Sequence, residues 1–317
     1  PDNLVEELGV GQRQRVEILK VLYRGANILI FDEPTAVLVP QEVDDLFGAL
    51  EGLRAKGMAV IFISHKLDEV LRVADDVTVV RAGETVAEVK SKDVTARQLA
   101  ELMVGSELPQ PTTHGDTRRS EVTLELKDVS IPTATGSRDL ISHISFNLHA
   151  GEVVGIAGVE GNGQAELVEA IMGLRNYTGS IDFQGSSIDH MSVAHRHDLG
   201  IGLIPEDRQR QALMMDSPLW ENRILGHQRG KPVMRGFILD RKATIEDTKR
   251  IMEEFDVRAP GPMTAAAALS GGNQQKFIVG REMSKAPALL VASHPTRGVD
   301  VGAQGAIWEV LREARTQ

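Results

Sequence analysis

The sequence contains no cysteine and no long apolar run. The absence of cysteine from 317 residues excludes disulfide bonds and thiolate metal sites. No apolar run approaches the roughly 18 residues that a membrane-spanning helix needs, and the first residues do not resemble a secretory signal. Pro1 stands where an initiator methionine would stand, so we expect the chain to be part of a longer protein.

The chain also lacks the excess of basic residues that is typical of nucleic-acid-binding proteins. Its 45 Asp and Glu residues outnumber its 35 Lys and Arg residues, which gives a formal net charge of −10. A nucleic-acid partner usually demands a basic face, so this balance argues against one. A hydrophobic share of 42% is ordinary for a soluble globular protein, and the length favours two domains.

An internal repeat organises the chain. Residues 8–39, LGVGQRQRVEILKVLYRGANILIFDEPTAVLV, align without a gap with residues 269–300, LSGGNQQKFIVGREMSKAPALLVASHPTRGVD, at a constant offset of 261 (269 − 8). Few residues are identical, but both segments follow the order glycine turn, helix, apolar strand and Pro-Thr. An offset of one whole domain indicates a tandem duplication. At this offset, the counterpart of residue 158 would lie before Pro1 and the counterpart of residue 65 would lie beyond Gln317. We therefore expect the first copy to lack its N-terminal part and the second its C-terminal part.

The repeat predicts the domain organisation. We expect the first copy over residues 1–108, a Pro- and Thr-rich linker over 109–120, and the second copy over 121–317. In the first copy, the apolar strands at 28–31 and 59–64 alternate with helices. That alternation is typical of an α/β fold with a parallel sheet covered on both faces.

The remaining elements follow from the same patterns. We expect a helix from about Gln41 and a pair of short strands across residues 77–89. VTLELKDVS and LISHISFNL alternate apolar and polar residues, which predicts an antiparallel layer in the second copy. Helical stretches from about 218 to 256 are expected before the second glycine turn.

Two carboxylates, Asp32 and Glu33, end the apolar strand in ILIFDEPT. Acidic groups at the carboxyl end of a parallel strand lie where open α/β sheets bind ligands. An Asp there can hold Mg²⁺ in a phosphate site, and a Glu can polarise a water. Two solvated acids are the alternative, but the ISH stretch after the next strand, which ends in His65, favours a functional site.

The stretch LSGGNQQK places Ser270, Gly271 and Gly272 directly before a helix. Exposed amides at a helix N-terminus, together with one hydroxyl, make an anion site. A helix cap with a flexible turn is the alternative. The recurrence of the motif 261 residues apart favours the anion site.

Residues 158–167, GVEGNGQAEL, have the outline of a phosphate loop. In the template G-x-x-x-x-G-K-[ST], backbone amides cradle phosphates while the Lys neutralises their charge. Gly158 and Gly163 fit the template, but Gln164 stands at the Lys position and Ala165 at the Ser or Thr position. The one Gly-Lys pair in the sequence is followed by Pro232, so no phosphate loop with its lysine is present.

Together these stretches resemble the ATP-binding-cassette (ABC) ATPases, and the resemblance covers essentially the whole chain. LSGGNQQK and LGVGQRQR are similar to the signature motif, ILIFDEPT to the Walker B motif with its catalytic glutamate, and ISH to the switch histidine. LMVGSEL, PEDR and PTRGVDVGA point to the ATPase subunits of sugar and nucleoside importers, which carry two cassettes on one chain. GVEGNGQ paired with VASHPTRGVD favours the nucleoside branch.

The resemblance implies a fold and a set of site residues. The fold is two tandem P-loop (RecA-like) nucleotide-binding domains, the second with an antiparallel β layer and a helical subdomain. The cofactors implied are ATP and Mg²⁺, and two cassettes pack head to tail around each ATP. The residues implied are Glu33 and His65 in catalysis, Asp32 at the metal, and Ser270, Gly271, Gly272, Asp300, Gly158, Gly161, Gly163 and Gln164 at the nucleotide.

Departures from the family pattern fall on one of the two composite sites. They are Gln164, Ala165, Ser293 and His294 in the second copy, and Gly9 and Val39 in the first. We therefore expect one site that hydrolyses ATP and one degenerate site. Without a phosphate-loop lysine, the chain alone is expected to be nearly inactive.

The resemblance further implies an ATPase subunit that energises uptake of a nucleoside or sugar. Its partners are integral-membrane permease subunits and, indirectly, an extracytoplasmic substrate-binding protein, and it lies peripherally on the cytoplasmic face of the membrane. Two alternatives stay open: a soluble tandem-cassette ATPase that acts on ribosomes or nucleic acid, and a nucleotide-binding regulatory module without turnover.

Two smaller features complete the sequence. His190, His195 and His197 could form a metal cluster, but their spacing does not place them on one helical face, so we expect a solvated helix. PEDRQRQ at 205–211 stands where the family has the Q-loop that links nucleotide to permease, without the expected Gln. We favour a role in coupling over a charged surface turn.

Overall fold

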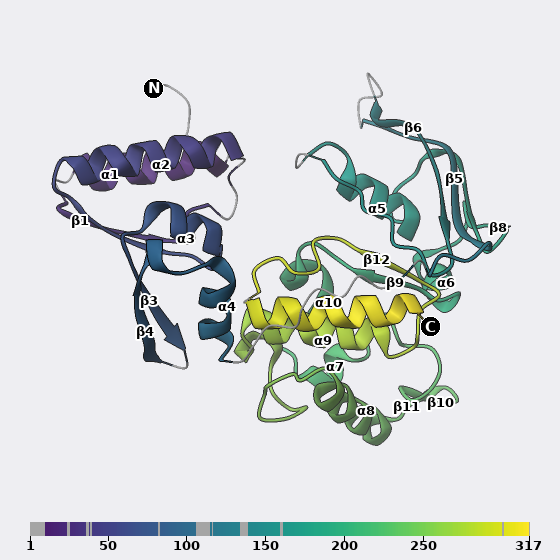
Figure 1. Cartoon of the computed structure of the whole chain (residues 1–317). Coiled ribbons are helices and arrows are strands. Elements are labelled where there is room, and N and C mark those ends of the chain that lie inside the picture. Colours follow the sequence, from purple (N-terminus) through teal and green to yellow (C-terminus); the bar gives the residue numbers. More distant parts are fainter. Residues whose placement is uncertain are drawn as a thin grey trace. The chain divides into compact units, whose positions relative to one another are not determined.

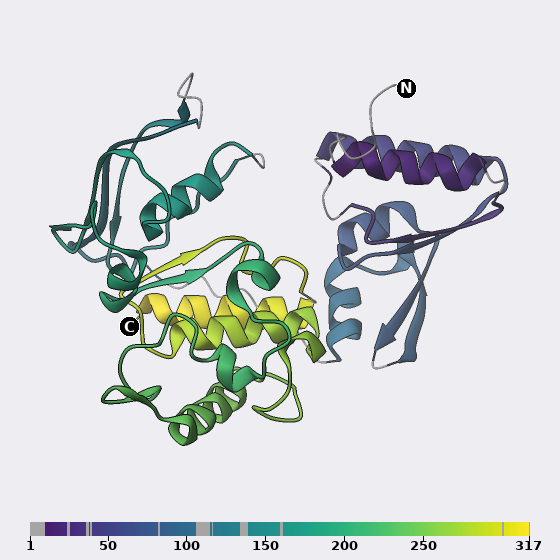
Figure 2. The same ribbon diagram turned by 180° about the vertical axis from the view of Figure 1, so that it is seen from behind.

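The computed structural model divides the chain into two compact units, Pro1–Gln110 and Pro111–Gln317. Figures 1 and 2 show their elements from opposite sides. No helix in the described part of the chain is both long and apolar enough to cross a membrane. The structure describes residues 10–23, 26–35, 38, 40–81, 83–105, 115, 117–133, 139–158, 161–299 and 301–316.

The first unit alternates helices with parallel strands and ends in a hairpin and a helix. β1 and β2 pair in parallel, from Ile28↔Ala59 to Asp32↔Ile63, and β3 and β4 pair antiparallel. The expected strands and the hairpin are thus confirmed, as is the helix near Gln41. The elements are α1 (Val10–Tyr23), β1 (Ile28–Asp32), α2 (Pro40–Ala55), β2 (Ala59–Ile63), α3 (Leu67–Val73), β3 (Asp76–Arg81), β4 (Glu84–Lys90), a 3₁₀ turn (Ser91–Asp93) and α4 (Ala96–Val104).

Helix α2 covers one face of the β1–β2 pair. Its Phe47 is 2% exposed and meets Phe62 edge to face, with ring centroids 5.9 Å apart. Because strand side chains alternate, the other face carries a second apolar row. The side chains of that row are 47% to 66% exposed. In the described part of this unit, helices therefore do not cover both faces of the β1–β2 pair as expected. The members of the row are Ile28, Ile30, Ile61 and Ile63.

The second unit combines an antiparallel sheet, ordered β6-β5-β7-β8, with a parallel pair, β12-β9. The expected antiparallel layer is confirmed. The elements are β5 (Val122–Pro132), β6 (Asp139–His149), α5 (Gln164–Met172), β7 (Thr178–Phe183), β8 (Ser186–Ser187), α6 (Val193–Asp198), β9 (Ile201–Ile204), a π-helical turn (Arg208–Ala212), α7 (Leu219–Asn222), β10 (Met234–Arg235), β11 (Ile238–Leu239), α8 (Arg241–Glu254), a 3₁₀ turn (Ala266–Ala268), α9 (Gly271–Met283), β12 (Leu289–Ala292) and α10 (Val301–Thr316).

Two hydrophobic cores hold this unit. One packs α5 against the antiparallel sheet, with Val129 and Ile181 fully buried. The other joins α7, α8, α9 and α10 around Phe277, Ile251 and Ile307. Burial of apolar side chains at this scale supplies the main driving force for folding.

The helical stretches expected over about 218–256 are found as α7 and α8, and the β10–β11 hairpin lies between them. The segment between them, RGKPVMRGF, contains two glycines and a proline, which disfavour helix. The apolar run before the phosphate-loop-like turn does not form a strand, and its Val153 and Ile156 are 68% and 54% exposed.

Three elements recur in the two units at the spacing of the sequence repeat. Helices α1 and α2 and strand β1 begin at residues 10, 40 and 28, whereas α9, α10 and β12 begin at 271, 301 and 289. Each pair differs by 261. Glu33 and His294, which follow β1 and β12 at the same offset, share a φ of 47°. The aligned segments therefore adopt the same local structure.

Arg196 of α6 is the largest fully buried polar side chain of the antiparallel region. It is 1% exposed and donates to the backbone carbonyls of Ala170, Ile171 and Ile188 at 2.7 to 2.8 Å. Two of these carbonyls lie in the last turn of α5. Gly173 N also donates to Ala170 O and Met191 N to Ile188 O, each at 3.0 Å, so the guanidinium is a second donor to these two carbonyls. Gly173 leaves room for the guanidinium, since a Cβ there would lie 2.8 Å from Arg196 Nε.

We expect Arg196→Met to lower the free energy of unfolding by about 1–3 kcal/mol, because it removes a buried charged donor from three backbone carbonyls, two of which keep a backbone N–H. Chemical denaturation of the chain measures this change. Arg235→Met, at an exposed position of β10, is the control and should change the free energy by less than about 0.5 kcal/mol. Equal losses in the two variants would contradict the role of Arg196.

Candidate functional site

The parallel register of β1 and β2 brings the acidic strand end and the ISH stretch together. Asp32 pairs with Ile63 at the last position of the ladder, and Glu33 N donates to Ile63 O at 2.9 Å. His65 follows two residues after the end of β2. The carboxyl ends of both strands thus lie at one edge, where open parallel sheets bind ligands.

Glu33 and His65 are in direct contact. Glu33 Oε1 accepts from the His65 backbone N at 3.1 Å and lies 2.7 Å from His65 Nδ1. Glu33 Oε2 is buried and has no hydrogen-bond partner. The φ of 47° at Glu33 is unfavourable for a side chain of this kind and is typical of functional sites.

This arrangement suits the activation of a water molecule. One carboxylate oxygen is fixed in place, while the other is left to accept a hydrogen bond. Since Nδ1 of His65 faces the carboxylate, Nε2 is the ring nitrogen left for a ligand. Asp32, the residue before Glu33 in the chain, is exposed at the end of β1.

A second polar group, which sequence reasoning missed, supports the turn after Glu33. Thr35 is fully buried and donates through Oγ1 to Glu69 Oε2 at 2.5 Å. Lys66 Nζ donates to Thr35 O at 2.9 Å and pairs with Glu69 at 3.3 Å. The recurrence of Pro-Thr in both halves of the repeat was the available signal for Thr35. These contacts tie the strand end to the start of α3.

Ser270, Gly271 and Gly272 form the N-terminus of α9, as expected. Ser270 is the N-cap, and its Oγ accepts from Asn273 N at 3.4 Å and from Asn273 Nδ2 at 3.0 Å. Both contacts use the hydroxyl oxygen, so neither uses its hydrogen. Gly272 is buried, and a Cβ at Gly271 would lie 2.4 Å from Arg208 Nη2.

Arg208 joins three segments of the second unit. Its Nε donates to Gln274 Oε1 of α9 at 3.2 Å, and its Nη1 and Nη2 donate to the carbonyls of Arg297 and Gly298 at 2.6 and 3.2 Å. Arg297 in turn pairs with Glu206. We call this group of contacts the Arg208 clasp. Through Arg208, the PEDR stretch joins the turn after β9 to the turn after β12 and to α9, while most other side chains of 205–211 are exposed.

The phosphate-loop-like turn precedes α5, as expected. Gly163 is the N-cap with a φ of 100°, and a Cβ there would lie 2.1 Å from Ile141 Cγ2. Gly161 also has a positive φ, of 90°. Gln164 Nε2 lies against Gly158. A Cβ added to Gly158 would lie only 2.3 Å from this nitrogen. A neutral amide thus lies against the turn where a phosphate loop has its Lys.

Some expected residues cannot be placed. Asp300, Gly9 and Val39 lie outside the described residues. The structure therefore brings Glu33 and His65 together in the first unit, and joins Ser270, Gly271 and Gly272 to the Arg208 clasp in the second.

The histidines of the second unit are arranged differently from the expectation. His195 is exposed, but His197 turns inward toward His227 and Glu282, with Nε2 3.5 Å from Glu282 Oε2. A solvated helix is thus wrong for His197. Burial lowers the pKa of His227 to about 2. Burial also acts to raise the pKa of Glu282, but Arg281 and the two histidines hold it at about 2.

We expect Arg208→Ala to destabilise the second unit by about 1–3 kcal/mol, because it removes the donors for two backbone carbonyls and Gln274. Amide hydrogen exchange of residues 296–299 should speed up as well. Arg210→Ala, at an exposed position of the same turn, serves as the control. If both variants behave alike, the clasp does not hold these segments together.

Comparisons with known proteins give a consistent family. A family model described as ABC transporter matches residues 1–36 and 141–297. The nucleoside import ATP-binding protein NupA of Lactococcus lactis is 44% identical over 318 residues, which cover 100% of this chain and 63% of NupA. The guanosine import ATP-binding protein NupO of Bacillus subtilis is 41% identical, and the match covers 99% of this chain and 62% of NupO.

A third relative has a different cargo in its name. The glucose import ATP-binding protein TsgD13 of Haloferax volcanii is 45% identical over 318 residues, which cover 99% of this chain and 57% of TsgD13. The chain therefore spans about three-fifths of the length of these relatives.

Solved structures agree on the fold. The dimeric post-hydrolysis state of the ATP-binding cassette MJ0796 bound to ADP and Pi matches with a TM-score of 0.52 at 20% identity, over 61% of this chain and 82% of that chain. A nucleotide-free ATP-binding cassette from an ABC transporter matches with the same score and identity, over 61% and 77%. The fold is thus the α/β fold of an ABC cassette. The family model matches more than half of the residues of this chain, so the chain belongs to the ABC transporter family.

Proposed function

We propose that the chain is part of the ATP-binding and hydrolysing subunit of an importer for nucleosides or sugars. The names of NupA and NupO support nucleoside cargo, and the name of TsgD13 supports sugar. Such a subunit works with integral-membrane permease subunits and, indirectly, with an extracytoplasmic substrate-binding protein. Its place is the cytoplasmic face of the membrane, as a peripheral protein.

The contact between Glu33 and His65 carries this proposal. A carboxylate at the carboxyl edge of a parallel sheet, with one oxygen fixed by His65 and the other without a partner, suits the polarisation of an attacking water. Phosphoryl transfer depends mostly on positioning and charge neutralisation, and the geometry around Glu33 supplies the positioning.

We further propose that the chain contains parts of two tandem cassettes, over residues 1–108 and 121–317, joined by the linker 109–120. The sequence repeat supports this division, as does the recurrence of a helix, a strand and a second helix at the same offset. Cassettes that pair head to tail would combine motifs from both copies at each nucleotide.

The competent site would take Asp32, Glu33 and His65 from the first cassette. The exposed Asp32 carboxylate has the oxygen donors that Mg²⁺ prefers, and the metal would neutralise phosphate charge there. Ser270, Gly271 and Gly272 would close on the phosphates from the second cassette, and Asp300 would adjoin them. The hydroxyl hydrogen of Ser270 and the first amides of α9 are donors of the kind that bind an anion.

The second site would be degenerate. Gln164, which lies against Gly158, offers no positive charge to phosphates. Ser293 and His294 follow β12 where the first unit has its two carboxylates, so the donor set there does not fit Mg²⁺. Gly158, Gly161 and Gly163 could still bind nucleotide through backbone amides.

In the complete protein with its permease, Glu33→Gln should abolish ATP hydrolysis and uptake while ATP binding is kept. The substitution retains the shape of the side chain but removes the charge that polarises water, which costs about 10² to 10⁴ in rate. Steady-state ATPase and uptake of labelled guanosine and glucose measure the effect and identify the cargo.

The matched control is His294→Gln, at the equivalent position after β12. It should leave hydrolysis nearly unchanged, because it lies in the degenerate site. Equal damage from both substitutions would show that the two sites are not specialised. Uptake of neither cargo by the unmodified protein would contradict the proposed function.

Ser270→Ala should lower hydrolysis in the complete protein by an amount equivalent to about 3 kcal/mol, the typical cost of one donor aimed at a transferring group. Gly9→Ser, in the signature motif of the first copy, should gain nothing, because the degenerate site would still lack its Lys and its carboxylates. The two ATPase rates are compared under the same conditions.

A control is needed because Ser270 also caps α9. Ser192→Ala removes the N-cap of α6, whose hydroxyl accepts from His195 N, and so matches the loss of a cap at another position. Hydrolysis that survives Ser270→Ala, or falls equally with Ser192→Ala, would refute a direct role for Ser270.

A further inference from the structure

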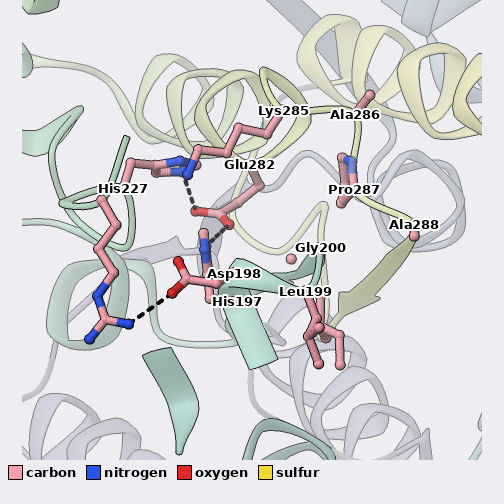
Figure 3. Close-up of a pocket in the computed structure, with 13 residues that line it drawn as sticks. His197, Asp198, Leu199, Gly200, His227, Glu282, Lys285, Ala286, Pro287 and Ala288 are labelled. Carbon is pink, nitrogen blue, oxygen red and sulfur yellow. Dashed lines mark hydrogen bonds and ion pairs between the residues drawn. The ribbon is translucent and has the colours of Figure 1, made fainter. Parts of the chain in front are cut away.

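His197, His227 and Glu282 form a buried cluster at the end of the β9–β12 pair that lies opposite the Arg208 clasp. His197 is in α6, directly before β9, and Glu282 is in the last turn of α9, before β12. His227 follows α7. Figure 3 shows the three side chains converging beside a cavity of about 370 Å³. The cluster is therefore distinct from the residues assigned to nucleotide.

The ligand atoms in the cluster lie close together, at separations somewhat longer than those around a shared ion. His197 Nε2 lies 3.5 Å from Glu282 Oε2, and His227 Nε2 lies 4.0 Å from Glu282 Oε1. One ligand atom from each of the three residues lies within 4.8 Å of the others. Good hydrogen bonds to nitrogen are shorter than about 3.2 Å. Two ligands of a tetrahedral ion at 2.0 to 2.1 Å would lie about 3.3 Å apart, so a small inward movement would complete such a site.

Burial leaves the imidazole nitrogens without other partners. His227 is 1% exposed, and neither its Nδ1 nor its Nε2 has a hydrogen-bond partner among the described residues. His197 Nδ1 is buried without a partner as well. The two rings meet edge to face with centroids 4.9 Å apart, which satisfies none of these nitrogens. Buried polar groups are rarely left in this state, so a missing ligand is indicated.

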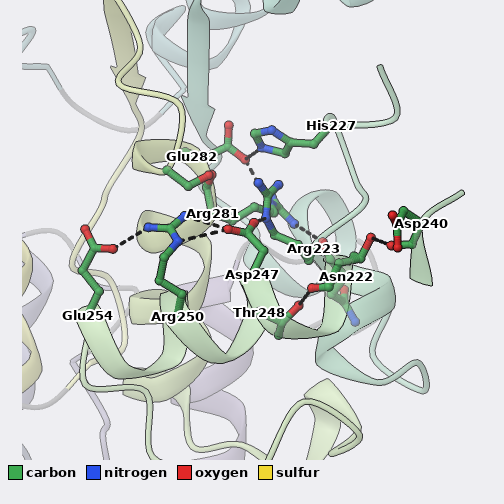
Figure 4. Close-up of polar contacts among 12 residues, drawn as sticks. Asn222, Arg223, His227, Asp240, Asp247, Thr248, Arg250, Glu254, Arg281 and Glu282 are labelled. Atoms are coloured by element: carbon green, nitrogen blue, oxygen red, sulfur yellow. Dashed lines mark hydrogen bonds and ion pairs between the residues drawn. The ribbon is translucent and has the colours of Figure 1, made fainter. Parts of the chain in front are cut away.

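Glu282 already accepts one close hydrogen bond, from Arg281, and a longer one to Oε2 from Leu203 N at 3.5 Å, so Oε2 keeps room for a further partner. Arg281 Nε donates to Glu282 Oε1 at 2.9 Å, and its Nη1 binds the carbonyls of Ala212 and Asn222. Arg223 pairs with Asp247 at 2.6 Å. Figure 4 shows both pairs beside His227. Glu282 Oε2 thus faces His197 and the cavity.

We propose that His197, His227 and Glu282 bind one divalent transition-metal ion, of which Zn²⁺ is the best fit. Two imidazole nitrogens and one carboxylate oxygen suit Zn²⁺ and its neighbours, whereas Mg²⁺ and Ca²⁺ prefer oxygen donors alone. The cavity leaves room for water as a fourth ligand. The ion would join three segments that are distant in the chain: α6, α9 and the loop that follows α7.

The test is metal binding by the whole 317-residue chain, free of any polyhistidine tag. After dialysis against a chelator, the chain should take up one Zn²⁺, measured by elemental analysis, and its melting temperature should rise. Co²⁺ should give the intense visible bands of a tetrahedral nitrogen and oxygen site. His197→Gln and His227→Gln should each weaken Zn²⁺ binding. Loss of a group that only contacts a metal ligand costs roughly 10- to 100-fold in affinity, and loss of a ligand itself should cost at least as much.

The control is His195→Gln, at the exposed histidine of the same helix, which should bind as tightly as the unmodified chain. If a variant fails to fold, the Co²⁺ spectrum and the chelator-dependent melting temperature of the unmodified chain decide the question. A chain that takes up no Zn²⁺, shows no tetrahedral Co²⁺ bands, or loses binding equally in His195→Gln would overturn the proposal.

Discussion

The parallel pairing of β1 with β2 is the constraint on which the first candidate site depends. Because the two strands run in the same direction and in register to Asp32↔Ile63, their carboxyl ends meet at one edge. Glu33 and His65, separated by 32 positions in the chain, therefore come within 2.7 Å. The left-handed backbone at Glu33 is held by its own bond to Ile63 O and by the contacts of Thr35.

Buried arginines play the corresponding part in the second unit. Long connections between short elements leave backbone carbonyls without partners, and each must be satisfied. Arg196 serves the end of α5, Arg281 serves the turns around α7, and Arg208 serves the turn after β12. An arginine suits this role because it offers five donors in a fixed, planar arrangement. The positions of α5 and α9 therefore rest on polar contacts as well as on the hydrophobic cores.

The two ends of the β9–β12 pair carry different chemistry. At the carboxyl end lie the Arg208 clasp and the N-terminus of α9, with backbone amides and guanidinium groups that favour anions. At the amino end lie two imidazoles and a carboxylate, which favour a cation. Helix α9 reaches both, since Ser270 caps its start and Glu282 lies in its last turn.

The sequence by itself determined the elements of the repeat, the acidic strand end and the glycine turn before α9. These follow from local patterns, because an apolar strand, a helix start and a glycine turn are each encoded in a few adjacent residues. The same patterns predicted the antiparallel layer and the hairpin after β2. They predicted helical stretches over 218–256 but not the short β10–β11 hairpin between α7 and α8.

Only the tertiary structure decided which side chains meet across distant segments. Thr35 with Glu69, Arg208 with Arg297, and His197 with Glu282 are pairs without a common local motif. The spacing of His190, His195 and His197 pointed to a solvated helix, yet one of them turns inward to partners 30 and 85 positions away. Their contact arises because β9 and β12 pair in parallel, which brings α6, before β9, and the end of α9, before β12, to the same end of the pair. That pairing depends on the packing of the whole unit rather than on any short segment.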